Sequence, residues 1–141
     1  MNLKNNRVED MGNESGIINI RKQVLLNNNF RKTIWTGDFL QVTQMSIPAG
    51  GEIGLEIHKD VDQFIKVEYG VASVYMGKTK QDIKFVGNAN SNNAILIAAG
   101  TLHNIINQQK TPLKLFSIYA PPNHPLGTIH KTKFDSDIDD E

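Results

Sequence analysis

The sequence predicts an all-β domain that folds as an antiparallel sandwich or barrel, and three observations favour this class. Short strand-like runs follow one another at regular spacing with turn residues between them, and no stretch shows a convincing helical period. Many short strands joined by Gly- and Pro-containing turns are typical of antiparallel sandwiches and barrels. The chain of 141 residues is also long enough to bury the core of one domain.

The expected strands begin at residue 21, and turn residues separate each strand from the next. Three asparagines at 27–29 form the first turn, and the Pro-Ala-Gly-Gly sequence at 48–51 ends the long third strand. Residues 94–98 are continuously apolar, which is typical of a buried strand. The expected strands are residues 21–26, 30–35, 39–47, 52–58, 63–68, 71–76, 82–86, 94–98, 101–108 and 113–120.

The two ends of the chain differ in composition from the domain at 21–134. Residues 1–20 are rich in Asn and charge, which predicts a flexible arm, although 17–20 is also compatible with a strand that pairs with a second subunit. Residues 135–141 are mostly acidic, which predicts a solvated tail.

Charge and composition exclude several classes of protein. The 15 basic residues are balanced by 15 acidic ones, so a nucleic-acid partner is not expected. There is no cysteine, which excludes disulfides and thiolate metal sites and fits a reducing compartment. No apolar run approaches the ~20 residues that a membrane span needs, and the N-terminus has no signal-peptide pattern. We therefore expect a cytoplasmic protein with no membrane partner.

Two stretches of the chain carry residues with the chemistry of metal ligands. Glu56 and His58 stand two apart in a strand-like run, which puts both side chains on one face. Gln63 follows a short polar turn, so it faces the same cavity if the chain doubles back there. His103 follows a second turn further along the chain. Two histidines, one carboxylate and one amide form a plausible ligand set for a divalent metal ion.

The first stretch resembles the first signature motif of the cupin superfamily. That motif is Gly, five residues, His-x-His, three or four residues, Glu, six residues and Gly. Gly50, His58 and Gly70 match it. Glu56 stands where the first His belongs, and Gln63 stands where the Glu belongs.

The second stretch resembles the second cupin motif, which is Gly, five residues, Pro-x-Gly, two residues, His, three residues and Asn. Gly100, His103 and Asn107 match it, while Asn92 replaces the Gly and Ala98 replaces the Pro. The resemblance implies an antiparallel jelly-roll β-barrel, the cupin fold, and a homodimer. Some relatives with this kind of sequence look like mannose-6-phosphate isomerase-like cupins, and others are dioxygenases.

The resemblance also implies roles for the ligand-type residues. Glu56, His58 and His103 are the expected catalytic residues, because they would hold a divalent ion such as Fe, Mn, Zn or Ni. Gln63 is either a fourth ligand or a residue that orients a ligand or a bound water. The function expected is a metal-dependent isomerase or dioxygenase acting on a small polar or sugar-like substrate. The alternatives are a barrel that binds a small ligand without turnover and a metal-free barrel that mediates assembly.

Four further residues are candidates for binding the substrate. Tyr75 and Tyr119 could offer phenol groups, although core packing is the simpler role for at least one of them. His124 and His130 lie in the Pro-rich segment after the last expected strand, which could cover the barrel mouth. A surface loop or a dimer contact is the alternative for that segment.

Overall fold

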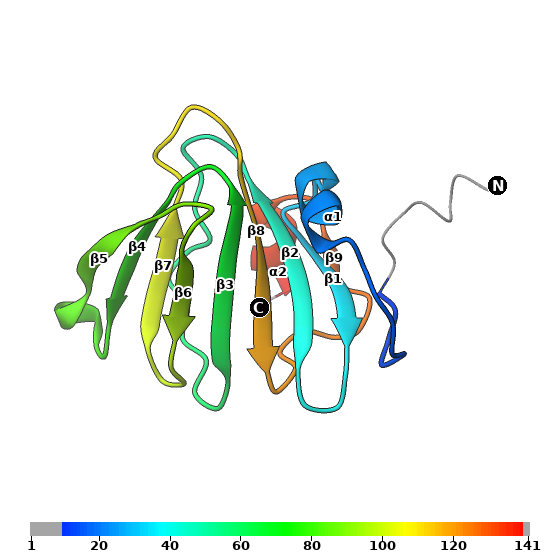
Figure 1. Cartoon of the computed structure of the whole chain (residues 1–141). Helices are drawn as coiled ribbons and strands as arrows, with labels where there is room; N and C mark the ends of the chain where they lie inside the picture. Colours follow the sequence, from blue (N-terminus) through cyan, green and yellow to red (C-terminus); the bar gives the residue numbers. More distant parts are fainter. Residues whose placement is uncertain (1–9, 140–141) are drawn as a thin grey trace.

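The structure, a computed structural model, describes residues 10–139 and consists mainly of antiparallel β-strands (Figure 1). Every paired strand is antiparallel to its neighbour, so the predicted all-β antiparallel fold is confirmed. The elements are α1 (Ile20–Leu26), β1 (Arg31–Thr36), β2 (Gln41–Ile47), β3 (Asp62–Tyr69), β4 (Ala72–Gly77), the 3-10 helix η2 (Lys80–Asp82), β5 (Lys84–Ala89), β6 (Ala94–Ile97), β7 (Leu102–Ile106), β8 (Leu113–Ala120), β9 (Ile129–His130) and α2 (Lys133–Asp139).

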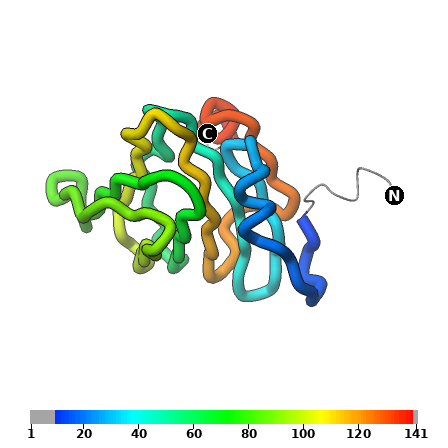
Figure 2. The backbone as a smooth tube through the Cα atoms, turned by 45° about the horizontal axis from the view of Figure 1, so that its top comes forward, coloured from blue at the N-terminus to red at the C-terminus, as the bar shows by residue number. Residues whose placement is uncertain are grey.

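The strands form two sheets that enclose one hydrophobic core. The larger sheet has the order β6-β3-β8-β2-β1-β9, and the smaller sheet has the order β5-β4-β7 (Figure 1). Figure 2 shows the path of the backbone from a second direction. The core joins residues of both sheets, for example Met45 and Leu115 of the larger sheet with Val74 and Ile105 of the smaller one. Burial of these side chains from both sides is the main force that holds the sheets together.

The inner face of the larger sheet changes from apolar to polar along its strands. Register pairs between β2 and β8 show the change, because they share one face: Ile47 with Leu113, Met45 with Leu115, Thr43 with Ser117, and Gln41 with Tyr119. All of these residues are buried. A polar interior is costly unless it is hydrogen-bonded or used for binding, so the polar end marks the place where a site is expected.

The segment expected as the first strand is a helix. Residues 20–26 form α1, whereas the sequence analysis predicted a strand at 21–26. The side chain of Asn19 caps the helix by accepting a hydrogen bond of 3.1 Å from the Lys22 amide, and Val24 is fully buried. Arg, Lys, Gln and Leu are good helix formers, and so short a run is decided by a cap and by packing rather than by a clear period.

The acidic C-terminal segment also differs from its prediction. Residues 135–139 belong to α2 instead of a solvated tail, and residues 140–141 lie outside the described part. Ser136 is buried, and the Asp139 carboxylate lies 2.7 Å from the His130 ring. This end of the chain is therefore packed against β9, a short strand that the sequence analysis did not predict.

Part of the predicted N-terminal arm lies along β1. The Met11 amide donates to the Ile34 carbonyl at 2.9 Å, and the Thr36 amide donates to the Gly12 carbonyl at 3.0 Å. Residues 17–19 are not in a strand, and residues 1–9 lie outside the described range. Except for 52–58, the remaining expected strands are found, with bounds that move by no more than three residues.

Candidate metal centre

Glu56 lies in an irregular segment that runs beside β7. Its amide donates to the His103 carbonyl at 2.9 Å, and the His103 amide donates back to the Glu56 carbonyl at 2.9 Å. The predicted strand at 52–58 is reduced to two isolated bridges, because Gly54 adopts a positive φ of 100°. Asn104 holds that kink by accepting a hydrogen bond of 3.0 Å from the Gly54 amide. The backbone pairing sets Glu56 directly beside His103.

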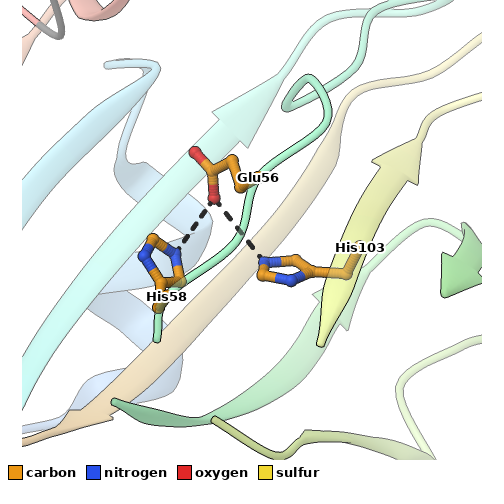
Figure 3. Close-up of side chains that lie close together, drawn as sticks. All are labelled: Glu56, His58 and His103. Carbon is orange, nitrogen blue, oxygen red and sulfur yellow. Dashed lines mark ion pairs between the residues drawn. The ribbon is translucent and has the colours of Figure 1, made fainter. Parts of the chain in front are cut away.

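Three side chains from the two predicted stretches converge in space (Figure 3). The Glu56 Oε2 atom lies 3.4 Å from Nε2 of His58 and 3.7 Å from Nε2 of His103. The Gly100 amide donates to the His58 carbonyl at 2.8 Å, which links the first stretch to the turn before β7. All three ligand atoms lie within 4.8 Å of one another, which is the size of a mononuclear metal site.

The hydrogen bond of His103 fixes which of its ring nitrogens is free. Nδ1 lies 2.9 Å from the Thr101 carbonyl oxygen, which can only accept, so Nδ1 carries the proton. In the neutral ring, the Nε2 lone pair then faces the Glu56 oxygen. Nε2 of His103 and Nε2 of His58 are buried and have no hydrogen-bond partner within the described residues. Acceptors facing an anion require a cation or a proton between them, so the donor set fits a divalent metal ion.

Glu56 is ionised in this arrangement. Burial alone would raise its pKa, but the imidazoles of His103 and His58 and the charge of Arg31 outweigh burial and hold the pKa of Glu56 well below its usual range. The Arg31 Nη2 atom lies 3.5 Å from the second carboxylate oxygen of Glu56. The carboxylate therefore presents Oε2 to the imidazoles and Oε1 to the guanidinium.

Gln63 is buried on β3, at the polar end of the interior. Its amide nitrogen donates to the Ser117 hydroxyl at 3.3 Å, while its Oε1 has no hydrogen-bond partner within the described residues. A free amide oxygen is available to a metal or to a bound water. Both roles that the sequence analysis left open for Gln63 remain predictions.

Two of the four predicted substrate contacts lie next to the three converging side chains. The Tyr119 ring meets the His58 ring edge-on at 5.7 Å, and the His124 ring meets Tyr119 edge-on at 5.2 Å. Gln41 fixes the loop that carries His124, because its side chain accepts from the His124 amide at 2.9 Å and donates to the His124 carbonyl at 2.8 Å. The loop after β8 thus lies beside the site.

Burial keeps both of these rings neutral near pH 7. It raises the pKa of Tyr119 to about 12 and lowers the pKa of His124 to about 3. The charge of Arg31 opposes the shift at Tyr119 and adds to the shift at His124. The site is therefore lined by an uncharged phenol and an uncharged imidazole.

The other two predicted contacts are not brought to the site. Tyr75 pairs in register with Asn104, the residue after His103, so it lies on the opposite face of the smaller sheet, where it packs on Phe85. His130 is buried between Arg31 and Asp139, with ring-nitrogen distances of 3.4 Å and 2.7 Å to them. Of these two partners, Asp139 belongs to α2 and Arg31 belongs to β1.

Arg31 and Gln41 are the residues of this region that the sequence analysis missed. Arg31 lies next to Lys32 in the same strand, and nothing in the local pattern shows which of the two cations points inward. Asn107, which matches the second motif, has a structural role: its side chain donates to the carbonyls of Ile47, Pro48 and Thr111.

The chain was compared with known proteins. It aligns with protein BH2720 of Bacillus halodurans with a TM-score of 0.91 at 48% identity, over 93% of this chain and 99% of that one. It aligns with the cupin domain of Schizosaccharomyces pombe Cnp3 with a TM-score of 0.60 at 14% identity, over 70% and 67% of the two chains. It aligns with the oxalate decarboxylase of Lactobacillus farciminis with a TM-score of 0.56 at 18% identity, over 62% of this chain and 26% of that one. Fold and site together define a cupin-fold protein with a candidate metal centre.

Sequence relatives identify the family more closely. The chain is 50% identical to YrkC of Bacillus subtilis (strain 168) over 133 residues, which are 94% of this chain and 72% of YrkC. It is 41% identical to L612 of Acanthamoeba polyphaga mimivirus over 118 residues, which are 83% of this chain and 72% of L612. The chain therefore belongs to the family of YrkC and L612. No family model matches it. Within residues 10–139, no helix has the length and apolarity to cross a membrane.

Proposed function

We propose that Glu56, His58 and His103 hold one divalent metal ion and that the protein is a small metal-dependent enzyme. The observation that carries this proposal is the convergence of two imidazole nitrogens on one carboxylate oxygen, at 3.4 Å and 3.7 Å. Neither nitrogen has a hydrogen-bond partner in the part of the chain that the structure describes. One carboxylate and two imidazoles suit Fe, Mn, Zn or Ni, and the amide oxygen of Gln63 is the candidate fourth ligand. The side chains of His58 and Glu56 keep 15% and 21% of their surface exposed, so a small molecule can reach the centre.

The bound metal would polarise a carbonyl or hydroxyl oxygen, or bind oxygen, which are the chemistries of an isomerase and of a dioxygenase. The protein's own residues would place the substrate. Tyr119 keeps its proton because its pKa is raised to about 12, so it can donate a hydrogen bond to a substrate oxygen. His124 stays neutral because its pKa is lowered to about 3, so it can accept a proton or a hydrogen bond. The substrate class is a small polar or sugar-like molecule, as in mannose-6-phosphate isomerase-like cupins.

Metal analysis of protein purified without chelator tests the proposal. We expect about one equivalent of a divalent metal in the wild type, and its loss in His58→Ala and in His103→Ala with the fold retained by circular dichroism. His124→Ala is the matched control, since it removes a neighbouring imidazole that is not in the ligand set. Equal metal content in the wild type and both ligand variants would remove the metal centre. A metal-loaded protein that binds small sugars without turning them over would instead favour a non-catalytic binding barrel.

We also propose that the protein is a cytoplasmic homodimer. An apolar groove of about 470 Å³ on the β6-β3-β8 part of the larger sheet supports association, because Phe64, Leu96 and Ile118 contribute to its lining. A monomer mass in light scattering at micromolar concentration would contradict the dimer. The balanced charge and the absence of cysteine fit the cytoplasm.

A further inference from the structure

Arg31 is a buried cation beside the candidate metal centre. Its side chain is 1% exposed, although a charge is costly to bury unless it is well paired. Its Nη1 donates to the Ser136 hydroxyl at 2.6 Å and lies 3.4 Å from Nδ1 of His130. Its Nε has no hydrogen-bond partner within the described residues.

The ion pairs of Arg31 within residues 10–139 include a single carboxylate, that of Glu56, at the long distance of 3.5 Å. Arg31 contacts the Glu56 carboxylate through Nη2 alone, while its Nη1 lies against Ser136 and His130. The anchors come from α2 and β9, so the packed C-terminal segment keeps the guanidinium in place. Glu56 is therefore the one carboxylate within the described residues that pairs directly with this guanidinium.

The charges around the metal position do not cancel when a divalent ion is bound. A divalent ion brings +2, the buried Arg31 brings +1 and Glu56, 3.5 Å from it, brings −1. The sum of these three charges is +2 in a mostly buried place, where charges interact more strongly than in water. The Asp139 carboxylate lies on the far side of His130 and is 66% exposed, so solvent screens its charge. The metal-free site has no such excess, since Arg31 and Glu56 then balance each other.

From this excess we propose that the metal-loaded site selects an anionic ligand or substrate, such as a carboxylate, and that Arg31 supplies the selectivity. This inference rests on the metal centre proposed above and deepens it by naming the charge of the substrate. Arg31 need not touch the anion, because it is separated from the metal position by one carboxylate group. Its Nη2 atom lies 3.5 Å from the Glu56 carboxylate, so its charge lies beside the metal position.

Acetate and acetamide provide the test, because they share a shape and differ in charge. The protein is loaded with Co(II), and each ligand is titrated at pH 7 while the visible absorption of the cobalt is followed. We expect the wild type to bind acetate at least tenfold more tightly than acetamide. Arg31→Met should weaken acetate binding at least tenfold with little effect on acetamide, and Arg31→Lys, which keeps the charge, should restore most of the preference.

A matched control and a folding check accompany these variants. Arg21→Met removes an arginine whose side chain is 63% exposed, so acetate binding should stay at the wild-type level. If Arg31→Met does not fold by circular dichroism, Arg31→Gln replaces it as the neutral variant, compared with Arg31→Lys. Equal binding of acetate and acetamide in the wild type, or wild-type acetate binding in the neutral variant, would overturn the anion site and leave the metal centre standing. A wild type that takes up no Co(II) would overturn both.

Discussion

Replacing His124 with glutamine should change how the stability of the protein depends on pH. The pKa of His124 is lowered to about 3, mainly by burial, against ~6.5 for an exposed histidine. At pH values between these two pKa values, the His124 imidazole binds a proton in the unfolded chain but not in the folded protein. The stability is therefore complete above pH 6.5 and falls as the pH falls toward 3.

The size of this effect follows from the pKa difference. At pH 5 the imidazole is 1.5 units below its unfolded pKa of ~6.5, and each unit is worth ~1.4 kcal/mol, which gives roughly 2 kcal/mol. Because the ring of His124 is only partly buried, solvent screens part of this penalty and roughly 1–2 kcal/mol remains. His124→Gln removes the titrating group and leaves the backbone hydrogen bonds to Gln41 in place.

Urea unfolding of chelator-treated protein at pH 7.5 and pH 5 measures the effect. We expect the wild type to lose roughly 1–2 kcal/mol more of its unfolding free energy between the two pH values than His124→Gln loses. The other three histidines are present in both proteins, so their titrations cancel in the comparison. An equal loss in the two proteins would show that the folded protein does not hold His124 neutral, and would refute the reasoning.

Two further predictions concern the ligand set and the C-terminal helix. Gln63→Glu should tighten Co(II) binding if Gln63 is a direct ligand, because a carboxylate adds negative charge; weaker binding in a cobalt titration would instead show that Gln63 only orients other groups. Ser136→Ala should lower the free energy of unfolding by roughly 1–3 kcal/mol, since it leaves a buried Arg31 nitrogen without its 2.6 Å partner. Asp137→Ala, which breaks only an exposed pair on the same helix, is the control, and an equal change in thermal denaturation would contradict the role of Ser136.

The strand pattern and the motif spacing could be predicted from the sequence because both are defined by the positions of neighbouring residues along the chain. Alternation with a period of two predicts strands wherever turn residues bound a run, and most of the expected strands are present. The resemblance to the two cupin motifs implied that the side chains of Glu56, His58 and His103 meet. The structure brings all three within 4.8 Å, although Gly54 breaks the strand that was expected to carry Glu56 and His58.

The two helices could not be read in the same way. Each is seven residues long, which is too short to show a helical period, and an isolated helix of that length is marginal in water. Burial of Val24 and of Ser136 holds these segments in place, and burial depends on what the rest of the chain places beside them. Residues 135–141 were predicted to be a solvated tail because their acidic composition can be seen in the sequence. Their contacts with Arg31 and His130 can be seen only in the structure.

The sequence by itself determined the all-β class, because periodicity and turn spacing act over a few residues. Its resemblance to the two cupin motifs identified the three residues that converge on the candidate metal position. Only the tertiary structure decided the surroundings of that position. The inward orientation of Arg31, its anchoring by α2, and the separation of Tyr75 from the site depend on the pairing of strands distant in sequence. The physical reason is that burial and charge balance are properties of the folded neighbourhood, so the same residue is a surface cation or a buried one according to the strands and helices packed against it.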